Sequence, residues 1–266
     1  MRTKLLLIFT LLSFHLSTAQ VMGPSASKLA TYNAETVPIH KIEFEPFFEI
    51  ISAKKAFNAD GMLQDITYGP DENFRSGTAG FRFTYGAFKN FEIGAVLPTD
   101  ISSASLGIKY RLPFKVNTDF ALLAGINTPF EAQSITRTYF TVSNTTALAY
   151  GMALTKSFSE KFSMDANIQA QNYLKKTDEK HFVDIFISTD WGYFVSEGYQ
   201  CLLGLGYSLS DFEDDSFDSQ EFTVIPGFTL EKAENFIIVF GFPLTVYGKN
   251  TEQTQNAGFA LTIILE

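Results

Sequence analysis

The stretch FSMDANIQAQ, residues 162–171, decides the fold. Apolar and polar side chains alternate along it without interruption. Because successive side chains of a β-strand point to opposite faces, this stretch predicts a strand with one apolar and one polar face. Such a strand needs water on one side and apolar surroundings on the other.

Eleven further segments show the same alternation, and the composition supports them. The chain contains 28 Phe and 11 Tyr, both of which favour strands. The segments are 40–52, 77–87, 91–98, 102–112, 118–127, 144–157, 182–193, 199–209, 220–230, 235–247 and 256–265. Together with 162–172, they predict about twelve strands.

The connections between these segments differ in length in a regular way. Short connections are 88–90, 158–161, 194–198 and 231–234. Longer polar connections are 53–76, 128–143, 173–181, 210–219 and 248–255, with one brief exception around Thr99-Asp100. Short turns at one end and long loops at the other are typical of outer-membrane barrels, and this register puts both termini on the short-turn, periplasmic side.

The faces of the strands favour a membrane barrel over a soluble sandwich. Opposite the large apolar side chains lie Gly, Ala and Ser mixed with charges, as a narrow wet lumen requires. Aromatic side chains gather at the strand ends next to the short turns, as at a membrane boundary. A closed barrel also satisfies every backbone hydrogen bond in lipid. The sequence therefore predicts an all-β fold, a transmembrane antiparallel up-and-down β-barrel of about twelve strands, over residues 40–266.

The N-terminus has the pattern of a secretory signal peptide. A basic start is followed by an apolar run from Leu5 to Leu16 and by small residues. The run is shorter than the roughly 20 residues of a membrane-spanning helix, which makes a helical anchor the weaker alternative. We expect a signal peptide at 1–19 cleaved after Ala19, a flexible periplasmic lead at 20–39, and insertion into a Gram-negative outer membrane.

Charge and cysteine content exclude several classes of partner. Removal of Arg2 and Lys4 with the signal peptide changes the formal charge from -9 to -11. Such an acidic protein repels nucleic acid. The single cysteine, Cys201, can form neither a disulfide framework nor a thiolate metal cluster. The expected partners are outer-membrane lipid and a small-molecule solute, without a cofactor.

No enzyme is indicated. His40 and His181 lack metal-ligand spacing, and a lipid hydrolase would need His181 beside a lipid-facing serine, whereas Ser163 and Ser188 are predicted to face the lumen. The acidic loop 211–218 lacks calcium-loop spacing, so a solvated loop is favoured over a cation site.

Charged side chains predicted to point inward are the candidate functional residues. A barrel of about twelve strands has a lumen only modestly wider than its side chains. These charges form either a constriction that selects small solutes or an ion-pair network that plugs the barrel. They are Glu43, Glu45, Glu49, Arg82, Glu92, Lys109, Arg111, Asp165, Asp184 and Asp190.

Three successive predicted strands carry a resemblance to a known family. The stretches FEIGAVLP (91–98), SLGIKYRL (105–112) and AGINTP (124–129) resemble the outer-membrane "transporter" family named for the meta-pathway of phenol degradation. The resemblance implies an outer-membrane barrel that passes small molecules, aromatic ones included, and carries over no binding residues. A non-conducting barrel that acts through its extracellular loops is the alternative function, and a lipid hydrolase is the third.

Overall fold

The computed structural model describes most of the chain after the predicted signal peptide. The described residues are 21–25, 28–29, 31–66, 75–114, 117–130, 136–137, 140–141, 146–174, 183–210, 219–233 and 235–265. The predicted signal peptide, His181 and the acidic loop 211–218 lie outside them. Among the described residues there is no helix long and apolar enough to span a membrane.

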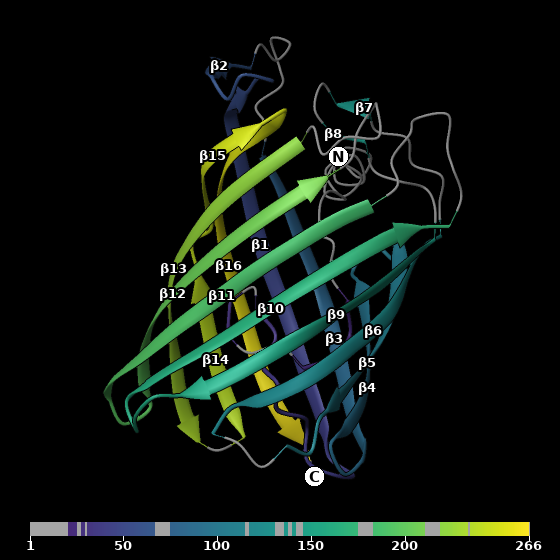
Figure 1. Ribbon diagram of the computed structural model, residues 1–266, viewed down its shortest axis with the longest axis vertical. Coiled ribbons are helices and arrows are strands. Elements are labelled where there is room, and N and C mark those ends of the chain that lie inside the picture. The colour runs from purple at the N-terminus through teal and green to yellow at the C-terminus, as the bar shows by residue number, and fades with distance from the viewer. Residues whose placement is uncertain are drawn as a thin grey trace, which may run out of the picture.

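The chain folds into a closed antiparallel barrel of twelve strands (Figure 1). Its strands are β1 (Ile42–Phe57), β3 (Arg75–Phe88), β4 (Phe91–Pro98), β5 (Ser103–Arg111), β6 (Asp119–Pro129), β9 (Ala147–Ser157), β10 (Phe162–Tyr173), β11 (Val183–Ser196), β12 (Tyr199–Ser210), β13 (Ser219–Ala233), β14 (Phe236–Gly241) with β15 (Leu244–Lys249), and β16 (Thr251–Leu265). Outside the barrel wall lie the short strands β2 (Leu63–Asp65), β7 (Thr136–Arg137) and β8 (Phe140–Thr141). The predicted fold class and strand number are confirmed.

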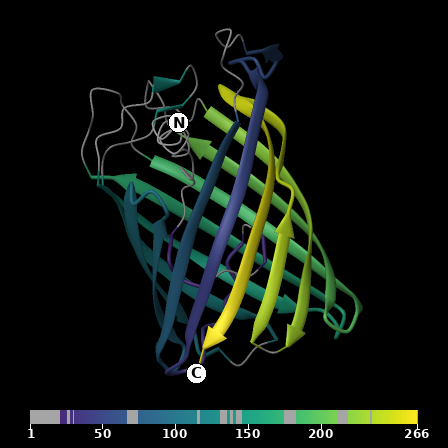
Figure 2. The ribbon, with the colours of Figure 1, turned by 180° about the vertical axis from the view of Figure 1, so that it is seen from behind.

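The first and last strands close the barrel. Strand β1 pairs with β16 from Ile42 opposite Leu265 to Phe57 opposite Thr251. Figure 2 shows the blue β1 between β3 and the yellow β16, with the C-terminal end beside the short turns. The backbone N–H and C=O groups of each strand are hydrogen-bonded to the neighbouring strands. The closed sheet therefore leaves no open edge to face lipid.

The last two strands depart from the prediction in two ways. The predicted strand 235–247 is divided into β14 and β15 at Phe242-Pro243, because proline has no N–H to donate to the ladder. The predicted loop 248–255 is wrong. Asn250, with φ 46, turns β15 directly into β16, so these residues are largely strand.

The two faces of the wall match the predicted alternation. Large apolar side chains such as Phe83 and Ile168 are exposed on the outside, where lipid would cover them. Glu92 and Lys109 on the inner face are fully buried. Buried charges need partners because an isolated ion loses its hydration. Those partners define the interior of the barrel.

The N-terminal lead differs from the prediction of a flexible periplasmic segment at 20–39. Its described residues up to Val37 lie mostly buried, and Val21 and Thr31 are fully enclosed. In Figure 1 the purple segment runs inside the barrel. The lead contacts the lumen wall at many points, and these contacts order it.

Candidate functional site: the lumen and its plug

A buried ion pair on the lumen wall, close to the short-turn end of β4, holds the N-terminal segment. Glu92 on β4 lies opposite Lys109 on β5, and Lys109 Nζ is 3.2 Å from Glu92 Oε1. Ser25 donates to Glu92 through its backbone N–H at 2.7 Å and through its hydroxyl at 2.8 Å. The Val37 N–H donates to the other carboxylate oxygen at 2.7 Å. Lys109 in turn donates to the carbonyl oxygens of Ser25 and Asn33.

The same segment also reaches the opposite wall. Asp190 on β11 accepts hydrogen bonds from the N–H groups of Leu29 at 3.1 Å and Thr31 at 3.3 Å. The Thr31 hydroxyl donates to the Ser188 hydroxyl at 2.9 Å. The chain therefore crosses the lumen from β4 and β5 to β11 and returns to Glu92 through Val37.

A third part of the wall completes the enclosure. The N–H of Val21 donates to Gln169 on β10 at 2.7 Å, and that of Ala34 donates to Thr155 on β9 at 2.8 Å. Val21 also packs into a buried apolar cluster with Leu123 of β6. The described residues of 21–38, named the plug from here on, thus bind strands around the lumen.

Glycines on the wall let the backbone of the plug approach closely. A Cβ atom on Gly94 of β4 would overlap the carbonyl oxygen of Gly23, and one on Gly107 of β5 would overlap that of Met22. Gly23 itself has a φ of 110°, a conformation that favours glycine. Small wall residues therefore provide the space that the plug occupies.

We expect the substitution Gly94→Ala to unseat the plug, because its Cβ atom and the Gly23 carbonyl cannot occupy the same space. The matched control is Gly206→Ala, whose Cβ atom would first meet Phe186 at an ordinary 3.6 Å. Single-channel recording should show more frequent openings for the first variant than for the second. Equal behaviour of both variants would mean that this contact does not seat the plug.

A second cluster of buried charges lies on β1, β3 and β16. Arg82 is 2.6 Å from Glu45 and 3.4 Å from Glu43. The Thr262 hydroxyl also donates to Glu45, at 2.7 Å. Because β1 and β3 are neighbours, the wall itself supplies the counter-charge, with one guanidinium for two carboxylates.

The remaining predicted residues are spread over the lumen. Glu49 accepts a hydrogen bond from the Asn256 amide at 3.1 Å, Asp165 accepts one from Thr155 at 2.6 Å, and Asp184 accepts one from Tyr173 at 2.7 Å. Arg111 pairs with Asp119 at 2.7 Å in a partly exposed position. The structure therefore brings five of the ten predicted charges together in two clusters, binds Asp190 to the N-terminal segment from β11, and leaves these four elsewhere on the wall.

Sequence reasoning missed the plug and two acids, the buried Glu252 and the partly buried Glu221. Glu221 accepts a hydrogen bond from Thr245 at 2.5 Å, and the alternation of its strand, which carries apolar Phe222 and Val224 on the other face, could have revealed it. Ser25 and Thr31 gave no comparable signal, because the lead shows no strand or helix period.

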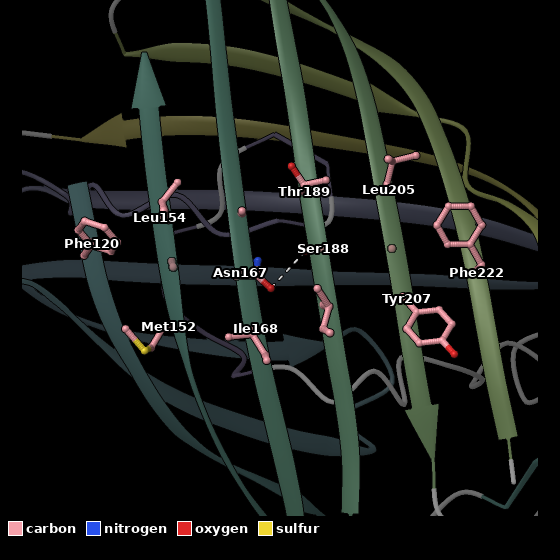
Figure 3. Close-up of a pocket in the computed structure, with 14 residues that line it drawn as sticks. Phe120, Met152, Leu154, Asn167, Ile168, Ser188, Thr189, Leu205, Tyr207 and Phe222 are labelled. Atoms are coloured by element: carbon pink, nitrogen blue, oxygen red, sulfur yellow. Dashed lines mark hydrogen bonds between the residues drawn. The ribbon is translucent and has the colours of Figure 1, made fainter. Parts of the chain in front are cut away.

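A separate groove of ≈ 490 Å³ lies on the outer face of the wall. Figure 3 shows Met152, Ile168, Leu205 and Phe222 among the side chains around it. Met152 and Ile168 are exposed on the outer surface. This groove therefore belongs to the lipid-facing surface, whereas the plug fills the inside.

The serines considered for a lipid hydrolase face inward. Ser188 is buried and accepts a hydrogen bond from Thr31 of the plug. The hydroxyl oxygen of Ser163 lies 3.4 Å from Lys28 Nζ of the plug. Within the described part of the chain, no group of three or more His, Cys, Asp or Glu side chains could hold a metal ion.

Several solved structures of similar fold are outer-membrane channels or porins. An outer-membrane channel from Pseudomonas putida F1 matches with a TM-score of 0.67 and 12% identity, over 87% of this chain and 98% of its own. The toluene transporter TodX from Pseudomonas putida matches with a TM-score of 0.50 and 10% identity, over 95% and 99%. The KdgM porin in complex with oligogalacturonate matches with 0.50 and 8%, over 85% and 99%.

Family comparison agrees with the fold. No curated protein shows a significant match. The family model described as "Putative MetA-pathway of phenol degradation" matches residues 98–263, more than half of the chain. The resemblance noted in residues 91–129 is therefore confirmed, and the chain belongs to this family of outer-membrane-type barrels.

Proposed function

We propose that the protein is an outer-membrane channel for the passive passage of small solutes, aromatic ones included. The observation that carries the proposal is a closed barrel with an apolar exterior and a charged interior. Family membership and the similarity in fold to outer-membrane channels support it. One protein of similar fold, TodX, is a toluene transporter, which supports aromatic solutes.

The buried charges form the constriction in this proposal. Glu92, Lys109 and Asp190 bind the plug. Arg82 and Glu45 narrow the lumen beside them. Fixed charges of both signs in a narrow pore set which solutes and ions can pass. Passage needs no catalytic step, so the protein acts without enzymatic chemistry.

The plug favours one second candidate, a non-conducting barrel that acts through its extracellular loops. The hydrogen bonds between the plug and strands β4, β5, β9, β10 and β11 would keep the lumen closed if the plug never moved. The two candidates differ in a single property, which is whether a water path ever opens.

Planar-bilayer recording of the mature protein separates the two. Insertion and folding are first verified by the heat-dependent migration of the barrel on gels. We expect infrequent, discrete conductance steps, which phenol reduces by occupying the pore. Silence from protein shown to be folded and inserted would contradict the channel and favour the second candidate.

A further inference from the structure

Leu29 of the plug fills a niche in the lumen wall that is floored by glycines. Cβ atoms placed on Gly204 of β12, Gly227 of β13 and Gly241 of β14 would lie 3.2, 2.7 and 3.0 Å from its methyl groups. Three neighbouring strands thus lack side chains at the point where Leu29 rests. The absence of those side chains creates a hollow of about the width of one isobutyl group.

The surroundings of this niche are apolar, in contrast to the charged wall around Glu92. Ile225 of β13 would contact a Cβ atom on Gly204 at 3.1 Å and one on Gly241 at 3.5 Å. Ile225 is buried, as are the neighbouring inward side chains of Leu202 and Val239. A hollow lined in this way holds an apolar group better than water.

One polar atom at the niche has no partner. Asp190 is only 2% exposed, and its Oδ2 accepts the two N–H groups of the plug. Its Oδ1 has no hydrogen-bond partner among the described residues. That oxygen lies 2.7 Å from the Cβ position of Gly204, so it faces the niche. Buried acceptors are normally satisfied, and this one would accept a donor from a molecule in the niche.

We propose that the niche is a solute-binding site, which Leu29 occupies in the closed channel. Its ligand is a small molecule with a compact apolar ring and one hydroxyl group. The ring takes the place of the Leu29 side chain over the glycines, and the hydroxyl donates to Asp190 Oδ1. This inference rests on the proposed function and deepens it by naming the solute class.

Binding at the niche also acts on the plug. Leu29 and a bound ring cannot occupy the niche together, and Asp190 holds the backbone of the plug on either side of residue 30. A solute that displaces Leu29 therefore weakens the attachment of the plug to β11. The solute promotes its own passage.

The test is probe binding to the full mature chain in lipid nanodiscs, followed by fluorine NMR. The probes are para-fluorophenol and para-fluoroanisole, which differ in the hydroxyl donor. We expect Leu29→Ala to bind para-fluorophenol roughly tenfold more tightly than the wild type, which must first give up the burial of Leu29. The anisole should bind more weakly than the phenol, and Asp190→Asn should reduce that preference.

A third variant refills the niche. In the Leu29→Ala background, Gly241→Val should restore weak binding, because the nearest atoms to its Cβ position are those of Leu29 and Ile225. Heat-dependent gel migration checks that each variant is folded. Equal binding by the wild type and Leu29→Ala would overturn the proposal, and so would tight binding retained after Gly241→Val. Binding is measured without transport, so a silent channel with an intact niche would overturn only the proposed function.

Discussion

Removal of residues 21–36 is expected to raise the single-channel conductance several-fold and to prolong the open state. The deletion takes away every hydrogen bond that the plug forms with β9, β10 and β11, together with the side chain of Leu29. Glu92 and Lys109 still neutralise each other across β4 and β5, so the wall keeps its internal ion pair. Planar-bilayer recording measures the change.

The control for this deletion is to verify that the barrel of the variant still folds. The wall is closed by β1 and β16, which do not include the deleted residues, so the heat-dependent gel shift should be retained. A folded deletion variant with wild-type conductance would show that the plug does not limit passage.

The substitution Lys109→Met is expected to lower the free energy of unfolding by about 3–5 kcal/mol, because it leaves Glu92 buried without a counter-charge. Unfolding by urea in lipid vesicles can be followed through the single tryptophan, Trp191, which stacks on Phe158 and Phe162. The double variant Glu92→Gln with Lys109→Met should recover most of the loss, because no buried charge then lacks its partner.

Arg111→Met provides the matched comparison. Its partner Asp119 lies at a similar ion-pair distance of 2.7 Å, but both side chains are partly exposed to solvent. Ion pairs of that kind contribute less than about 1 kcal/mol. If Lys109→Met and Arg111→Met destabilised the barrel equally, burial would not be the reason for the importance of the Glu92–Lys109 pair.

The strands could be predicted because their signal is local. Alternation in the stretch 162–172 identified β10 to within one residue, and it also separated lumen from lipid faces. The alternation pattern was a poorer guide where tertiary structure decides which residues join a strand. Pro243 interrupts an alternating segment, and the polar residues 251–255 belong to β16 although they resemble a loop.

The candidate site was predictable in part for the same reason. Arg82 and Glu45 lie on neighbouring strands with the same inward parity, so their pairing follows from the pattern. The plug does not follow from it. Its backbone is bound by side chains such as Glu92 and Asp190, which lie far away in the sequence, and its own residues carry no period. Only the three-dimensional arrangement reveals that these buried charges bind a peptide segment.

The most direct test of a channel closed by its own N-terminal segment is to lock the plug to the wall. The hydroxyls of Thr31 and Ser188 lie 2.9 Å apart, so Thr31→Cys with Ser188→Cys can form a disulfide. Cys201→Ser removes the exposed native thiol, which could mispair. Single-channel conductance is then recorded for the same oxidised protein before and after addition of a reductant. We expect silence while the disulfide is intact and discrete openings after its reduction. Equal conductance in both states would contradict a lumen that the plug opens and closes.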